Sequence, residues 1–534
     1  MLARKLPPTD KLICARYACC LLSKSTEVKC PVREASWEAF AAIRQKARQD
    51  ASFGGCQTQL LREYHRWPPA TMAAILIAAS RVFPAGHECT EKLLRKVLWR
   101  VQHFISCLNV RELLSMLEVF AFRGIREHDP RRTDLFLAAI PQLQAQAAVL
   151  SLSEVRRAAA LYKQLNIRNE PLFHALGQRL DELLEASLQR RRHDVDKLKS
   201  RAGPEEAAVM TFLGACGRLN ILPPKAHQLL NVVGPSARAR KDLPRLAALA
   251  QLAAKFGLGD AGEANQILIV VSAAFERAVP DAPMSKGYAS QAVYGQLLMA
   301  LVFDETECQM RDRALVASIH AVFADFGSAI AALDERLARQ LQVAELACRV
   351  ERPGVMQHLQ LKGLTAFLEG VKQLDDASQP LPKCSSQQHL QVSGALRELG
   401  VKHSTEEKLQ PYVADVRLAR QQRLIEIDGP LHFVSNSTRY DMKSSLKHRL
   451  LTKQGWDVHH IAWNDWPTHH HTRLTYVARL LRSPPPGKQL MEYSPLELSP
   501  LDRLDHLVCV VFEGALFSSV RETHKSPFWR SHLF

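Results

Sequence analysis

Acidic side chains gather in one short part of the sequence, in a pattern that could hold a metal ion. Asp415 lies on one predicted strand, and Glu426 and Asp428 lie on the next. Residues two apart on a strand share a face, so neighbouring strands could bring these three carboxylates together. Mg²⁺ prefers oxygen ligands, and once bound it can activate water and stabilise a scissile phosphate. The alternative is structural: Glu426 and Asp428 fix the turn that follows and bind backbone N–H groups or Lys447.

Cations and aromatic rings follow the same acids, as a site for a phosphate polymer requires. Cations bind phosphates, and exposed rings stack on bases. Trp456 is instead expected in the core, because it opens an apolar strand after a predicted helix C-cap at Gly455. Lys443 and Lys447 are also candidate catalytic cations. The candidate RNA-binding residues of this region are His432, Phe433, Lys443, Lys447, Arg449, Lys453, Trp463 and Trp466.

Short strands and helices must position these side chains. The sequence predicts strands over residues 414–418, 423–428 and 456–461, and helices over residues 443–454 and 473–481. Within the second strand, the side chains of Leu424 and Glu426 share one face, and those of Ile425 and Ile427 share the other. The region is therefore a small α/β domain.

The order and spacing of these residues resemble the RAP domain, an RNA-binding module named for its abundance in apicomplexan parasites. The resemblance covers residues 388–482 and implies an organellar RNA-binding protein, usually of the mitochondrion or plastid. Such proteins act in RNA processing, RNA stability, ribosomes or translation. The resemblance rests on Leu396-Arg-Glu-Leu-Gly400, Asp415, Glu426-Ile-Asp428-Gly429-Pro430-Leu-His432-Phe433, Lys443, Lys447, Leu450-Leu451, Gly455-Trp456, Trp463 and Trp466.

RAP domains in turn resemble the restriction-endonuclease-like fold, whose motif is an Asp on one strand and Asp/Glu-x-Lys on the next. Asp415 and Glu426 match the two acids, but Asp428 stands where that fold has the Lys that orients the attacking water. Lys443 or Lys447 could replace it. The departure favours RNA binding without cleavage and without a cofactor. A metal-dependent endoribonuclease that uses Mg²⁺ is the alternative.

The composition favours an anionic partner. The chain has 534 residues, with 70 Lys and Arg against 54 Asp and Glu, a net charge of +16. Cations that neutralise phosphates release counterions, so this excess favours a nucleic acid, although a basic protein with no such partner is the alternative. The length predicts two or more folded units, and no apolar run is long enough to span a membrane.

Neither the cysteines nor the histidines predict zinc. The 12 cysteines include no Cys-x-x-Cys pair and are scattered through apolar segments predicted to be helical, which indicates reduced core thiols. Three adjacent histidines, His469 to His471, have no Cys nearby, and neighbours on one segment rarely converge on one ion.

The first residues are basic and poor in acids, as in an organelle transit peptide. Pro7-Pro8 would break an early amphipathic helix, and a disordered basic tail or a partner-binding extension is the alternative. With the RAP resemblance, residues 1–36 predict a mitochondrial, or more broadly organellar, matrix location.

Residues 37–374 show apolar periodicity near 3.6, with Ala and Leu dominant. The segments 110–125, 153–167, 206–221 and 243–258 align as helices of small residues, each followed by a Gly or Asn turn and a second helix. Ile221 and Leu258 are 37 residues apart, and Ile125 and Ile167 are 42 apart. A period in this range predicts an α-solenoid of stacked hairpins. RAP proteins often carry such repeats; a helical bundle without repeats is the alternative.

The densest basic stretch lies between two of these repeats. A solenoid can track single-stranded RNA, with basic side chains on the phosphates. A solvated linker is the alternative, and a second cluster at Arg238, Arg240 and Lys241 is more typical of a solvated turn. The candidate RNA-binding residues of the stretch are Arg190, Arg191, Arg192, Lys197 and Lys199.

We therefore predict a mainly α protein. Residues 37–374 form an α-solenoid, residues 375–388 a linker, residues 389–482 a small α/β RAP domain of restriction-endonuclease-like fold, and residues 483–534 a C-terminal tail. The predicted partners are organellar rRNA or mRNA and mitoribosomal proteins, without a membrane. A role as a mitoribosomal or ribosome-assembly component fits these predictions. A helical scaffold that binds only proteins is a further alternative.

Overall fold

The computed structural model describes most of the chain between Ile105 and Arg482. The described ranges are residues 105–122, 130–192, 203–258, 262–276, 290–303, 309–359, 362–377, 386–419, 421–435 and 437–482, together with Leu76, Leu94 and Leu98. They belong to two compact units, Met1–Arg240 and Lys241–Phe534. The N-terminal extension and the C-terminal tail predicted above lie outside the described residues. None of the described helices is long and apolar enough to cross a membrane.

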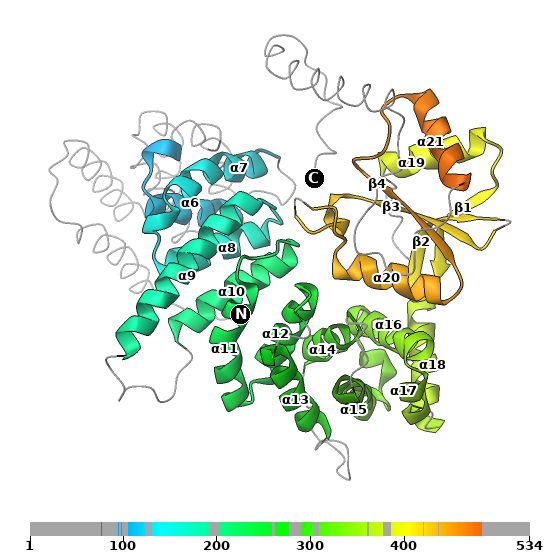
Figure 1. Cartoon of the computed structure of the whole chain (residues 1–534), viewed down its shortest axis with the longest axis horizontal. Coiled ribbons are helices and arrows are strands. Elements are labelled where there is room, and N and C mark those ends of the chain that lie inside the picture. The colour runs from blue at the N-terminus through cyan, green and yellow to red at the C-terminus, as the bar shows by residue number, and fades with distance from the viewer. Residues whose placement is uncertain are drawn as a thin grey trace, which may run out of the picture. The chain divides into compact units, whose positions relative to one another are not determined.

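The first unit consists of stacked helical hairpins (Figure 1). Each helix packs against the next but one: α6 against α8, α8 against α10, and α7 against α9. This pairing of alternate helices is what a solenoid requires, because each hairpin buries its apolar face only against its neighbours. The helices are α6 (Val110–Phe122), α7 (Pro130–Ala145), α8 (Leu152–Gln164), α9 (Glu170–Arg192), α10 (Pro204–Arg218) and α11 (Ala226–Arg240), with short 3₁₀ turns at Ile105–Cys107 and Ala147–Val149.

The helical part of the second unit continues the same pattern. One row contains α12, α14, α16 and α18, and α13, α15 and α17 form the other row. The bounds are α12 (Leu243–Lys255), α13 (Gly262–Glu276), α14 (Gln291–Phe303), α15 (Gln309–Phe326), α16 (Glu335–Glu351), α17 (Pro353–His358) and α18 (Lys362–Ala377), with a 3₁₀ turn at Ile330–Ala332. Helices thus occupy the segments where the apolar periodicity predicted them.

The predicted Gly or Asn turns end three first helices in the same way. Asn166, Asn220 and Gly257 all have positive φ, at 54°, 52° and 71°. The next residue then donates its N–H to a carbonyl five residues back, as in Ile167 to Tyr162 at 3.0 Å and Leu258 to Ala253 at 2.8 Å. This is the Schellman C-cap, in which a left-handed residue satisfies carbonyls that the helix leaves open.

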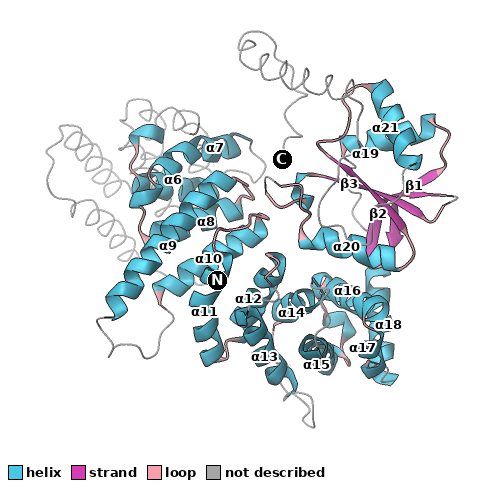
Figure 2. Cartoon of the chain, in the orientation of Figure 1, coloured by secondary structure: helices cyan, strands magenta, loops and turns pink. Residues whose placement is uncertain are grey.

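The strands form one small sheet after the helices (Figure 2). The strand order is β1-β2-β3-β4; β1, β2 and β3 pair antiparallel, and β3 pairs with β4 in parallel. Three of these strands were predicted, but β1 and helix α19 were not. The elements are α19 (Gln387–Glu398), β1 (His403–Leu409), β2 (Tyr412–Leu418), β3 (Arg423–Asp428), a 3₁₀ turn at Pro430–His432, α20 (Met442–Lys453), β4 (Asp457–Ala462) and α21 (His470–Arg482).

Helices cover both faces of the sheet, as the alternation in β3 requires. Ile425 packs on one face with residues of α19 and α21, including Leu396 and Val477. Leu424 packs on the other face with Leu451 of α20. The fold class is therefore as predicted: a mainly helical protein with a small α/β domain that has a mixed four-stranded sheet.

Candidate nucleic-acid interface

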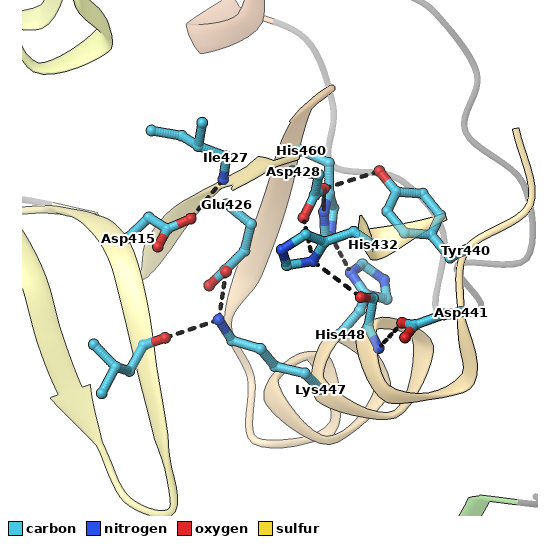
Figure 3. Close-up of polar contacts among 12 residues, drawn as sticks. Asp415, Glu426, Ile427, Asp428, His432, Tyr440, Asp441, Lys447, His448 and His460 are labelled. Atoms are coloured by element: carbon cyan, nitrogen blue, oxygen red, sulfur yellow. Dashed lines mark hydrogen bonds and ion pairs between the residues drawn. The ribbon is translucent and has the colours of Figure 1, made fainter. Parts of the chain in front are cut away.

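Asp415 uses its carboxylate to hold two strands together where their backbones separate. The ladder between β2 and β3 pairs Val416 with Ile425 and Arg417 with Leu424. Beyond it, the backbone N–H of Ile427 donates to Oδ2 of Asp415 at 2.7 Å, in place of a main-chain bond (Figure 3). An unpaired buried N–H would be costly, so this bond gives Asp415 a structural role.

Glu426 is buried and paired with a lysine from α20. Its side chain is 3% exposed, and Nζ of Lys447 donates to its Oε2 and also to the carbonyl of Val413 at 2.8 Å (Figure 3). Burial raises the pKa of Glu426 to about 7; Lys447 lowers it and Asp415 raises it further. The contact with Lys447 is the structural alternative that the sequence left open, and it keeps one lysine close to the acids.

Asp428 anchors a buried polar network. Its Oδ2 contacts Nδ1 of His460 at 2.6 Å and accepts from the hydroxyl of Tyr440 at 3.0 Å (Figure 3). Nε2 of His460 in turn lies 3.0 Å from Nδ1 of His448 on α20. Burial alone would raise the pKa of Asp428, but His460, His432 and Tyr440 together lower it. Asp428 therefore links β3 to β4 directly and, through His460, to α20.

The three carboxylates do not converge on one point. Asp415 binds a backbone N–H, Glu426 binds Lys447, and Asp428 binds His460. Among the described residues, no group of three His, Cys, Asp or Glu side chains could hold a metal ion. Oε1 of Glu426 has no hydrogen-bond partner but is buried, so it is not presented to a substrate. In this arrangement the candidate ligands do not fit Mg²⁺.

Exposed side chains do gather at the carboxyl ends of β3 and β4. Leu431 and Trp463 are 51% and 52% exposed, and the side chain of His432 is 44% exposed. Nδ1 of His432 lies 3.0 Å from Oγ of Ser444, which brings the start of α20 with the exposed Lys443 to the same end of the sheet. The backbone N–H of Trp463 donates to the carbonyl of Asp428 at 2.9 Å, and Nδ1 of His432 lies 3.3 Å from Oδ1 of Asp428. We call Leu431, His432, Lys443 and Trp463 the carboxyl-end surface. The carboxyl edge of parallel strands is a usual place for ligands in α/β sheets.

Two predicted stacking residues are core residues instead. Phe433 is 6% exposed and packs against Tyr440, with ring centroids 4.6 Å apart. Trp466 is 8% exposed and donates its Nε1 hydrogen to Gln391 at 2.8 Å. Neither ring can stack on a base without leaving the core. Trp456 is partly buried against the core, as predicted.

Arg449 was predicted to contact RNA, but it lies in a buried contact with the helical repeats. Its side chain is 3% exposed, and its Nε donates to Oε1 of Glu351 at 2.6 Å. Nη2 and Nη1 donate to the carbonyls of Val302 and Phe303 at 2.7 and 3.2 Å. Lys453 lies 3.2 Å from the same Glu351. Two of the predicted RNA-binding cations thus hold α20 against the ends of α14 and α16.

Two further contacts join the α/β domain to the same row of helices. Arg439 lies beside the C-cap of α12, since a Cβ built on Gly257 would come within 2.8 Å of its Nη2. Gln410 donates to the carbonyl of Lys372 in α18 at 3.4 Å. The domain therefore touches all four helices of one row, and its cations lie where helix dipoles place negative charge.

The remaining predicted residues fall partly outside the described structure. Arg190, Arg191 and Arg192 end α9, whereas Lys197 and Lys199 lie outside the described residues. The histidine triplet is exposed at the start of α21, and His470 lies 3.0 Å from Glu398.

Sequence reasoning missed the Arg449–Glu351 pair and the Asp428–His460 pair. The alternation of Val458 and His460 placed His460 on an inward face, which was the available signal for the second pair.

Residues 425–480 match the family model described as the RAP domain. The match covers most of β3, all of α20 and β4, and most of α21, and it includes the carboxyl-end surface and the Asp428 network. The predicted family is therefore confirmed for this part of the chain, which contains a RAP domain. RAP domains are in general RNA-binding domains, which is consistent with the RNA binding predicted from the sequence.

Proposed function

We propose that this protein binds single-stranded organellar RNA without cleaving it. The observation that carries the proposal is the carboxyl-end surface of the RAP domain. It presents one exposed indole at Trp463, one imidazole at His432 and one ammonium at Lys443. A flat ring beside cations is what an unpaired base and its phosphate need.

The net charge of +16 supports an RNA partner, since phosphate contacts gain free energy from released counterions. The basic, acid-poor start of the chain supports import into an organelle, with the mitochondrial matrix as the proposed location. Within it, we propose a role in RNA processing, stability or translation, with rRNA of the mitoribosome or its assembly intermediates as the first candidate target.

A binding assay with a matched control tests the RNA site. Full-length protein is titrated with labelled single-stranded organellar RNA, and Trp463→Ala is compared with Leu390→Ala, which removes a large exposed apolar side chain from α19. Loss of a stacked base costs about 1–3 kcal/mol, so Trp463→Ala should weaken binding roughly 5- to 150-fold. Leu390→Ala should leave it unchanged. Equal affinities for the two variants would contradict the proposed site.

A second assay with the full-length protein tests whether it cleaves the RNA that it binds. The contact between Lys447 and Glu426 is the observation that favours a nuclease, because it places a lysine beside one of the candidate catalytic acids. Incubation of RNA with the wild-type protein, in the presence of Mg²⁺, Mn²⁺ or chelator, should leave the RNA intact. Metal-dependent cleavage that Glu426→Ala abolishes would instead establish the endoribonuclease.

Crosslinking in cells identifies the RNA and its location. Recovery of rRNA would support the ribosomal role, and recovery of one messenger would indicate transcript-specific regulation. A fluorescent protein fused after residue 36 should enter mitochondria if the extension acts as a transit peptide. Cytosolic fluorescence would contradict the organellar proposal.

A further inference from the structure

The charge of this protein is divided unevenly along the chain. Residues 1–240 carry 37 Lys and Arg against 22 Asp and Glu, a net charge of +15. Residues 241–377 carry 13 against 17, a net charge of −4, and residues 386–482 carry 14 against 9, a net charge of +5. Within the first of these ranges, residues 105–240, which contain the described helices of the first unit, carry 20 against 14, a net charge of +6. The two sets of described helical repeats thus have opposite charge, although both show the same stacked-hairpin packing.

The acidic repeats are already occupied by the cationic α/β domain. Glu351 at the end of α16 receives Arg449 and Lys453. The ends of α12 and α14 face Arg439 and Arg449. These helix ends carry the negative pole of the macrodipole, so they attract guanidinium groups and repel phosphate.

Exposed side chains of the acidic repeats add to the repulsion. Asp334 and Glu335 are exposed at the start of α16, where Asp334 also accepts from the backbone N–H of Leu337 at 2.6 Å. Glu369 of α18 is 61% exposed and is paired with Lys372 at 2.7 Å. Both sets of repeats expose cations in the last turns of helices, as at Lys163 of α8, Arg218 of α10 and Arg349 of α16, so the difference between them lies in the net charge. The basic repeats therefore favour an anionic partner, and the acidic repeats favour a cationic one.

We infer that the repeats of residues 241–377 hold the RAP domain and exclude RNA, and that the RNA binds residues 1–240 and the carboxyl-end surface. This inference rests on the proposed RNA-binding function and names the parts of the chain that perform it. Solenoids offer extended binding surfaces along the stack. Here the repeats of residues 241–377 serve as a docking surface for the chain's own C-terminal domain.

Two matched double variants of the full-length protein test the inference. The first, Lys163→Gln with Arg218→Gln, removes two exposed cations from the basic repeats. The second, Arg313→Gln with Arg336→Gln, removes two exposed cations from α15 and α16 of the acidic repeats. Both lower the net charge by two, so a general effect of charge is the same in each.

The readout is affinity for single-stranded RNA as a function of salt, with ultraviolet crosslinks mapped in the wild-type protein. Each phosphate contact on a single strand contributes about 0.7 to the slope of log affinity against log salt. The first variant should reduce that slope by about 1.4, and the second should not change it. Crosslinks should fall within residues 1–240 and the RAP domain.

An equal loss of slope in both variants, or crosslinks on α12 to α18, would overturn the inference while leaving RNA binding intact. An unchanged slope in the first variant would overturn it as well. Absence of RNA binding by the wild-type protein would be a different result, which refutes the proposed function itself.

Discussion

Replacement of Arg449 by methionine should loosen the RAP domain from the helical repeats. Methionine keeps an unbranched apolar chain in place of the arginine methylene groups, but it lacks the guanidinium group and removes every donor. The change leaves Glu351, which is 6% exposed, and the carbonyls of Val302 and Phe303 without these bonds. Loss of one partner of a buried ion pair costs about 3–5 kcal/mol. Lys453, at 3.2 Å from Glu351, retains part of the pairing and favours the lower end of that range.

Amide hydrogen exchange measures this loss where it occurs. Amides in the last turns of α14 and α16 should exchange about 10²- to 10⁴-fold faster in Arg449→Met, provided that they exchange through undocking. Lys408→Ala is the control, because Lys408 is an exposed cation on β1 of the same domain. It should change exchange very little. The double variant with Glu351→Gln should lose less than the sum of the two single variants, since the two groups interact directly. Exchange at the wild-type rate in Arg449→Met would refute this account of docking.

Three further predictions concern the buried acid, the two tryptophans and one glycine. Because the pKa of Glu426 is raised from 4.5 to about 7, the folded state holds a proton that the unfolded chain releases between these values. The free energy of unfolding, measured by urea titration, should therefore fall as pH rises through that window. Glu426→Gln should reduce this fall, and the same dependence on pH in the variant and the wild type would refute the prediction. Trp466→Ala should cost about 3–5 kcal/mol of unfolding free energy, whereas Trp463→Ala should leave the melting temperature unchanged. Gly257→Ala should lower that temperature, since φ is +71° and the new methyl would approach Arg439; an equal or higher temperature contradicts this.

Local patterns predicted most of the elements because they follow from local physics. Apolar spacing located the helices, and left-handed turn residues such as Asn220 marked their ends. Strand β1 escaped prediction because its sequence, HSTEEKL, is polar and lies at an open sheet edge, where no face is fully buried. Period-2 alternation is a signal of one buried face, so an edge strand without such a face gives none.

Local patterns could not predict which cations are buried in ion pairs and which are exposed. Arg449 and Lys443 lie on one helix and look alike in sequence, yet one is buried against Glu351 and the other is exposed. Their difference depends on Glu351, which lies 98 residues before Arg449 in the chain. Sequence spacing within α20 carries no information about a partner at that separation. The same holds for the carboxylates. Their spacing correctly placed Asp415, Glu426 and Asp428 on adjacent strands, but each binds a different partner, which the spacing did not predict.

The division of charge predicts different contributions to RNA binding from the two parts of the chain that we infer to contact RNA. The net charge of +5 in residues 386–482 overstates what the RAP domain can offer to phosphates, because Glu351, which lies outside this range, already binds Arg449 and Lys453. What remains at the carboxyl-end surface is dominated by Trp463, so its contribution should come from stacking and depend weakly on salt. The basic residues of 1–240 should supply the salt-dependent share. Neutralising cations in the first unit should therefore change the salt slope, and Trp463→Ala should change affinity at every salt concentration by the same factor.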